Sequence, residues 1–316
     1  MTHKNTWDIV VVGGANMDYL VRGRELPKPG ETVMGDEFQE APGGKGANQA
    51  VAAARLGARV ALVGRVGTDK RGKAILKQLK KEGVNTKYIV SDEKEPTGVA
   101  LVLVGEGGEK EILTAPGANR QFSVNEVRDA TQVIQSARIL LTQLEVPLEA
   151  VILAAQLAHQ AGAKIILDPA PPISLPDELL RIVSLIKPNA REAEALTGVQ
   201  VRDRNSARNA AKRLLERGVG AVAVQAGDEG NLVVTSEQEY WLPKIPVQSV
   251  DATGAGDAFA AALAVALSEE RSWPEAGAWA SAAAALKTTK IGAQAGLPTR
   301  EQVLALLEKE GIKPQT

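Results

Sequence analysis

Short β-branched apolar runs alternate with longer segments rich in alanine and leucine along the chain. Residues 8–14 (DIVVVGG) precede 47–58 (ANQAVAAARLGA), and residues 59–67 (RVALVGRVG) precede 71–83 (RGKAILKQLKKEG). The same rhythm returns between residues 137 and 227. Strands that are apolar on both faces, each followed by a helix, indicate a parallel sheet covered on both sides. The pattern predicts a doubly wound α/β fold whose mainly parallel sheet is flanked by helices.

Two segments break this rhythm and predict a small β-sheet lid. Residues 17–44 and 95–119 carry strand-like stretches between proline and glycine residues, without a helical pattern. Their turn signals, PKPGE and GEGGEK, are typical of hairpins and tight loops. We expect one domain over residues 1–316, with the lid inserted from about 16–40 and 97–115. Such a lid could cover a substrate and exclude water, although an ordinary edge hairpin fits these segments equally well.

Composition narrows the classes of function. The 37 basic and 38 acidic residues nearly cancel, so no overall field favours nucleic acid or an anionic membrane as partner. The absence of cysteine excludes disulfides and thiolate chemistry, and two histidines, His3 and His159, make a serine–histidine triad or a histidine metal centre improbable. No apolar run is long enough for a signal peptide or a membrane span. We expect a cytoplasmic protein that acts on small molecules.

The stretch VDATGAGDAF, residues 250–259, is the first candidate for chemistry. Two aspartates, Asp251 and Asp257, bracket small residues immediately before an alanine-rich run that predicts a helix. Small residues let a ligand approach the backbone, and a helix N-terminus offers unpaired N–H groups to an anion, with phosphate the expected guest. The alternative is that the two acids merely cap the helix.

Two other motifs fail on inspection. VVVGGANMD resembles a dinucleotide fingerprint, but the second and third glycines of that pattern fall on Ala15 and Asp18. GTDKRGKA fits a P-loop until Ala74, which lacks the hydroxyl needed for magnesium, and its charges suit a solvated helix start.

Polar side chains near strand and helix ends suit a polyol. The glycines of PGGKGANQA stand at the head of a predicted helix with Asn48, whose amide both donates and accepts hydrogen bonds. Asn16 and Asp18 follow the first strand, where ligands of open α/β sheets tend to bind, and Glu145 ends another strand. Each residue alone is equally compatible with a turn.

Together these motifs resemble the signatures of the ribokinase/PfkB family of sugar kinases. PGGKGANQA and DATGAGD lie far apart and in the family's usual order. Four further stretches strengthen the resemblance, namely PGAN (116–119), TQLEVP (142–147), DPAP (168–171) and KPNAREAEALTG (187–198). The resemblance covers nearly the whole chain. It implies a ribokinase-like fold and ATP-dependent phosphorylation of D-ribose at its 5-hydroxyl, giving ribose 5-phosphate and ADP.

The resemblance also implies roles for individual residues. Asp257 would be the base that takes the proton of the attacking hydroxyl, and the 254–257 turn, with Gly254 and the N–H groups of Ala255 and Gly256, would form an anion hole. A helix N-terminus should make Asp257 a weak base, but phosphoryl transfer depends more on alignment than on base strength. The implied sugar positions are Asn16, Asp18, Gly44, Lys45, Asn48, Glu145 and Asp257.

The nucleotide and metal positions follow in the same way. The implied ATP positions are Asn189, Glu192, Gln225, Gly227, Gly254, Ala255, Gly256 and Ser281, with Glu192 acting through water around Mg²⁺. A monovalent cation, usually K⁺, would lie beside the anion hole, at Asp251, Thr253, Lys287, Lys290, Gly292 and Gly296. The family also implies a homodimer in which the lids of two subunits pair their strands.

Three positions depart from the family pattern. Gln225 stands where threonine is usual, and Ala252 replaces the more common threonine of the phosphate motif. Gly296 stands where a serine often supplies a cation ligand, so K⁺ would have to rely on backbone carbonyls or water.

The sequence leaves several functions open. The phosphate motif is common to deoxyribokinases, fructokinases and nucleoside kinases, although aromatics make up only 3% of the chain and leave few platforms for a nucleoside base. A non-catalytic sugar-binding protein on the same scaffold is the alternative from another class.

Overall fold

The large sheet contains nine strands. The computed structural model describes residues 6–106, 109–226, 230–242 and 244–312. In spatial order the strands are β13 (Glu239–Leu242), β12 (Asn231–Thr235), β11 (Ala221–Gln225), β10 (Leu185–Ile186), β9 (Lys164–Leu167), β8 (Ala137–Thr142), β1 (Trp7–Val12), β4 (Val60–Gly67) and β5 (Asn85–Asp92). All neighbours from β11 to β5 are parallel, and only β12 and β13 pair antiparallel. The predicted mainly parallel sheet is confirmed.

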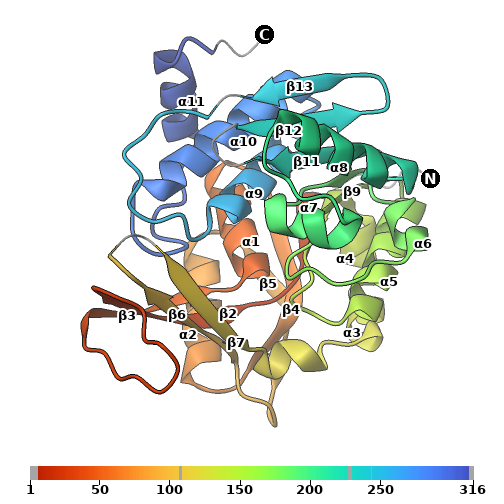
Figure 1. Cartoon of the computed structure of the whole chain (residues 1–316). Helices are drawn as coiled ribbons and strands as arrows, with labels where there is room; N and C mark the ends of the chain where they lie inside the picture. The colour runs from red at the N-terminus through yellow and green to blue at the C-terminus, as the bar shows by residue number, and fades with distance from the viewer. Residues whose placement is uncertain (1–5, 107–108, 227–229, 243, 313–316) are drawn as a thin grey trace.

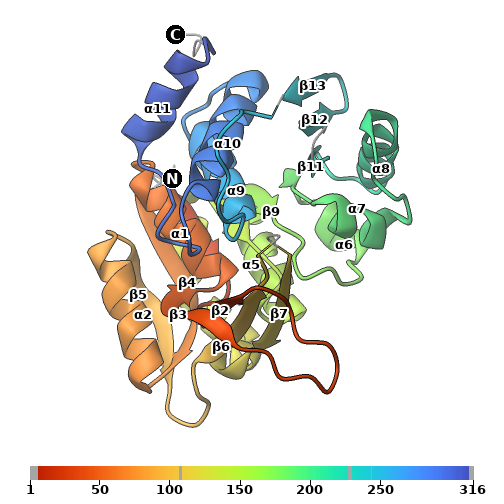
Figure 2. The same ribbon diagram turned by 60° about the vertical axis from the view of Figure 1, so that its left-hand side comes forward.

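Helices cover both faces of this sheet (Figures 1 and 2). One face packs against α1 (Lys45–Arg55), α2 (Lys70–Lys81), α9 (Ala255–Ser268), α10 (Trp273–Thr288) and α11 (Arg300–Lys309). The other packs against α3 (Val124–Asp129), α4 (Thr131–Gln135), α5 (Leu148–Gln160), α6 (Asp177–Leu180), α7 (Ala190–Thr197) and α8 (Arg204–Glu216). Strand β1 is a continuous apolar run because both of its faces are buried: Ile9 packs into one core and Val10 into the other.

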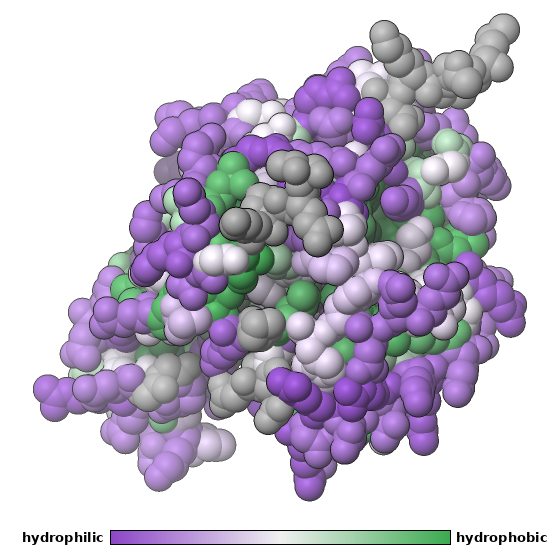
Figure 3. Space-filling view, turned by 90° about the horizontal axis from the view of Figure 1, so that it is seen from above, coloured by the Kyte–Doolittle hydropathy of each residue, from purple (hydrophilic) through white to green (hydrophobic). Residues whose placement is uncertain are grey.

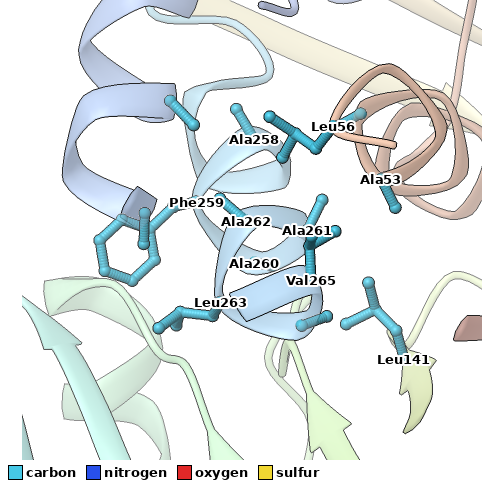
Figure 4. Packing of buried hydrophobic residues seen from close by; sticks show 14 of the residues in the cluster. Ala53, Leu56, Leu141, Ala258, Phe259, Ala260, Ala261, Ala262, Leu263 and Val265 are labelled. Carbon is cyan, nitrogen blue, oxygen red and sulfur yellow. The ribbon is translucent and has the colours of Figure 1, made fainter. Parts of the chain in front are cut away.

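Helix α9 is almost completely buried. Every residue from Asp257 to Ser268 is buried, and Figure 4 shows its alanines facing α1 on one side while Phe259 points toward a neighbouring helix. Alanine lets helices approach closely, since it adds little volume and loses no side-chain entropy. The apolar core therefore holds the N-terminal end of α9 in place.

A separate four-stranded sheet forms the lid, which lies at one end of the large sheet in Figures 1 and 2. Its order is β3 (Gly35–Gly43), β2 (Asn16–Gly23), β6 (Gly98–Val104) and β7 (Lys110–Ala115). Strands β2 and β6 are parallel, whereas β3 and β7 pair antiparallel at the edges. Strand β3 continues to Gly43, beyond the predicted boundary near residue 40, and leads directly into α1.

The rejected P-loop is a helix start. Asp69 caps α2, its carboxylate accepting a hydrogen bond from the N–H of Gly72 at 2.9 Å. On the face seen in Figure 3, hydrophilic residues predominate and apolar residues form small patches. Among the described residues, no helix has the length and apolarity to cross a membrane.

Candidate active site

A cavity of about 490 Å³ lies between the lid and the strand ends of the large sheet. The lid contributes Ala100, Val102, Ile112 and Thr114 to its wall. The structure brings all seven predicted sugar positions to this cavity, namely Asn16, Asp18, Gly44, Lys45, Asn48, Glu145 and Asp257. These seven residues come from four separate parts of the sequence and surround one polar space.

A second and larger hollow, of about 830 Å³, adjoins the first. Both are lined by Asn189, Gln225, Ala252 and Ala255. Of the other predicted nucleotide positions, Ser281 lines the larger hollow, whereas Glu192, Gly254 and Gly256 line the smaller one. Gly227 lies outside the described residues. The N-terminus of α9 thus stands where the two spaces meet.

The turn before α9 is shaped by Gly254. This residue is the N-cap, with a φ of 83° in the left-handed region, and a Cβ there would lie 3.0 Å from the carbonyl oxygen of Ala293. The first N–H groups of a helix lack partners inside it and can bind an anion. The N–H of Ala255 donates to the carbonyl of Ala252 at 3.1 Å, so a phosphate would have to replace that bond to use it.

Asp257 lies in the first turn of α9 and does not cap this helix. Its side chain is 6% exposed and accepts hydrogen bonds from Asn48 Nδ2 at 3.0 Å and Gln49 Nε2 at 3.1 Å. Burial raises its pKa, although Lys45 acts in the opposite direction. Burial therefore acts against the weak basicity that the helix N-terminus predicts.

A buried cluster of charged side chains lies next to Asp257. Lys45 Nζ lies 3.4 Å from Asp168 Oδ2 and 3.9 Å from Asp257 Oδ1, and Lys187 Nζ lies 3.3 Å from Asp168 Oδ1. Gln49 Nε2 donates to Asp168 Oδ2 at 2.9 Å as well as to Asp257. Burial alone would raise the pKa of Asp168, but the two lysines lower it.

Sequence reasoning missed Gln49, Asp168 and Lys187 as site residues, although all three stand inside the quoted motifs. Asp168 follows β9 directly, as Glu145 follows β8 after a short turn, and this placement was the available signal. Asn119 was also missed, and its Nδ2 donates to Asn16 Oδ1 at 2.8 Å.

Asn189 and Glu192 form the capping box of α7. The Asn189 side chain accepts from the N–H of Glu192, and the Glu192 carboxylate accepts from the N–H and Nδ2 of Asn189. Both residues therefore have a structural role besides the predicted one at the nucleotide. Among the described residues, no group of three or more His, Cys, Asp or Glu side chains could hold a metal ion.

Two carboxyl groups that line the smaller cavity have strongly raised pKa values. Burial, with Glu145 and Asp257 as neighbours, raises the pKa of Asp18 from 3.8 to about 7. Burial also raises the pKa of Glu145 from 4.5 to about 7, although Lys45 opposes it. Hydrogen bonding of the Lys45 N–H to Glu145 Oε2, at 2.7 Å, likewise favours the charged form.

We expect the free energy of unfolding to fall as the pH rises from about 5 to about 7, because the folded chain binds more protons at these two carboxyls than the unfolded chain. Groups with lowered pKa, such as Asp92 at about 2, act in the opposite direction below that window. Urea unfolding at several pH values measures this slope. The Glu145→Gln variant should flatten it, whereas wild-type stability that increases through the window would contradict the assignment.

The six positions predicted for a monovalent cation also lie together. Asp251 accepts from the N–H of Thr253 at 2.8 Å and from the N–H of Gly292 at 2.9 Å. Lys287 Nζ donates to the carbonyls of Asp251 and Lys290, both at 3.1 Å, and Gly296 packs against the Lys287 side chain. An ammonium group thus occupies the space between these residues, and the arrangement does not fit a potassium ion.

Comparisons with known proteins agree with this geometry. Residues 7–300 match the pfkB family of carbohydrate kinases. A ribokinase of Haemophilus influenzae is 43% identical over 300 residues, covering 95% of this chain and 98% of the relative. A deoxyribokinase of Salmonella typhi is 33% identical over 296 residues, covering 93% and 97%. The solved structure of Arabidopsis thaliana ribokinase complexed with ribose and ATP has a TM-score of 0.87 and 36% identity, covering 98% of this chain and 99% of that one. The chain belongs to the pfkB family of carbohydrate kinases.

Proposed function

We propose that the protein transfers the γ-phosphate of ATP to the 5-hydroxyl of D-ribose, which is the reaction of a ribokinase. The observation that carries this proposal is the position of Asp257, buried at the junction of a polar cavity and a larger hollow. The ribokinase relative and the ribokinase structure with ribose and ATP support the choice of both substrates.

The geometry supports a direct transfer. The 5-hydroxyl would give its proton to the Asp257 carboxylate while its oxygen forms a bond to the γ-phosphorus and the bond to the leaving ADP oxygen breaks. The N-terminus of α9 would stabilise the charge on the transferring group. Burial raises the pKa of Asp257, which is the direction that strengthens a base.

Mg²⁺ would reach the site with ATP and would neutralise charge on the phosphates, with Glu192 as its predicted contact through water. Glu192 is 6% exposed and lines the smaller cavity, which is consistent with that place. A potassium ion does not enter the proposal, because the Lys287 ammonium already lies among the residues predicted to bind it.

The experiment that tests the proposal measures ADP release from ATP and Mg²⁺ with ribose, 2-deoxyribose, fructose or a nucleoside as acceptor. We expect turnover to be highest with ribose. Higher turnover with 2-deoxyribose would transfer the assignment to the deoxyribokinase that the Salmonella typhi relative represents. If a protein that unfolds cooperatively released no ADP with any acceptor, the result would favour the non-catalytic alternative.

We also propose a homodimer formed through the lid. Its edge and outer surface carry exposed apolar side chains, with Met34, Phe38 and Leu113 exposed by 87%, 64% and 72%. Apolar patches of this kind favour association. A purely monomeric species in sedimentation velocity would contradict the proposal. The cytoplasmic location stays a prediction of the sequence.

A further inference from the structure

Lys287 is fully buried, near the end of α10. Lysine is almost never found in that state unless its ammonium group is paired. Its Nζ donates one hydrogen bond to the carbonyl oxygen of Asp251 and another to that of Lys290, each at 3.1 Å. The carbonyl of Asp251 belongs to the loop before α9, residues 250–254, which we call the phosphate loop, and that of Lys290 belongs to the turn after α10. The Lys287 side chain therefore joins two segments that are far apart in the sequence.

The surroundings of Lys287 are those of a cation site. The Asp251 carboxylate approaches from the same loop, oriented by the N–H groups of Thr253 and Gly292. Carbonyl and carboxylate oxygens bind hard cations, and they accept hydrogen bonds from an ammonium group equally well. The Lys110 ammonium, from lid strand β7, lies 3.8 Å from Asp251 Oδ1 at the edge of this cluster. Further positive charge in the same space would be repelled by both lysines.

Gly296 lies directly against Lys287, so any side chain added at position 296 would meet this lysine. A Cβ at this position would lie 2.6 Å from the carbonyl oxygen of Lys287 and 2.9 Å from its Cδ. The first distance is shorter than real contacts allow, and the second involves the stem of the same lysine. The contact with the carbonyl would exist for any residue at position 287, whereas the contact with Cδ is made by the lysine stem alone. Gly296 therefore leaves room for the lysine stem, and a serine there would require both the stem and the backbone to shift.

We propose that the Lys287 ammonium is a built-in cation, which replaces the monovalent activator at the phosphate loop and makes the enzyme independent of potassium. The inference rests on the proposed kinase function. Lys287 acts as a positioning residue, because it ties the carbonyl of Asp251 to the end of α10 and thereby fixes the loop that leads to Gly254. Burial lowers the pKa of Lys287, whereas the charges of Asp251 and Asp257 favour its ammonium form.

The first test is the cation dependence of the wild-type protein. ADP release with ribose is measured in tetramethylammonium chloride and again after replacement by potassium or sodium chloride at equal ionic strength. We expect the turnover number to change by less than about twofold, since a site already filled by an ammonium gains nothing from a second cation. A larger rise specific to potassium overturns the proposal.

A second readout does not need activity. The thermal midpoint of unfolding is compared in the same salts, because an ion that binds only the folded chain raises it. The wild type should show no rise specific to potassium, and such a rise overturns the inference. This measurement separates the two hypotheses, because a chain inactive on every sugar would contradict the kinase function and still report on the cation site.

Variants complete the test. Lys287→Met keeps the stem and removes the charge, and it should lower turnover at least about tenfold, as loss of an electrostatic contact near the transferring group does. Lys287→Ala removes the ammonium and most of the stem while Gly296 is kept, which leaves the carbonyls of Asp251 and Lys290 free for a metal ion, and it should gain a rise in both midpoint and turnover specific to potassium. Lys77→Ala, which removes an exposed lysine on α2, is the matched control. Unchanged turnover in Lys287→Met, or no potassium response in Lys287→Ala, overturns the proposal.

Discussion

Replacing Asp257 by asparagine should lower kcat by about 10²–10⁴-fold, the usual contribution of a general base. Asparagine has nearly the same shape, so the polar cavity and the end of α9 stay in place while the proton acceptor is lost. The KM values for ribose and ATP should therefore change much less than kcat. Steady-state kinetics with each substrate varied in turn measure both quantities.

The control for this variant is Asp129→Asn, at the exposed end of α3, which should keep wild-type kinetics. Circular dichroism and thermal unfolding would show that Asp257→Asn is folded. Turnover of Asp257→Asn within a few-fold of wild type would remove Asp257 from the role of base. A rise in ribose KM without a change in kcat would make it a binding residue.

Replacing Asp168 by asparagine should lower the free energy of unfolding by about 3–5 kcal/mol, the cost of breaking a buried ion pair. Asp168 is fully buried, and in its absence Lys187 would lose the carboxylate beside it while Lys45 would keep only the more distant Asp257. Urea unfolding followed by fluorescence or circular dichroism measures the change.

The matched comparison is Asp8→Asn, which breaks an aspartate–arginine pair with Arg59 at the surface. Exposed pairs contribute at most about 1 kcal/mol, so this variant should lose little. An equal loss in the two variants would show that the buried cluster contributes no more than a surface pair.

The strands and helices of this fold could be predicted because their patterns are local. β-Branched runs and alanine-rich segments alternate along the sequence, and the sheet of β1, β4 and β8 follows from them. Gly254 and its neighbours likewise revealed a helix start. Such features depend on the residues beside them in the chain, and they need no knowledge of distant partners.

The ion cluster could not be predicted, because its members meet only in the folded chain. Lys45 and Asp168 are 123 positions apart, and no periodicity links them. The same holds for Asp257: the helix N-terminus is visible in the sequence, whereas the burial that raises the pKa of this residue is not. The Lys287 ammonium is a third example, since its partners and the space at Gly296 come from different segments.

The burial of α9 has a consequence for how the substrate range can change over evolutionary time. Every residue from Asp257 to Ser268 is enclosed by neighbouring helices and strands, so a larger side chain there would displace the reactive carboxylate along with the helix. The lid, by contrast, contributes side chains of a separate small sheet to the wall of the smaller cavity. New acceptors can therefore arise by substitutions in the lid and at strand ends, while the phosphoryl-transfer half of the molecule stays constant.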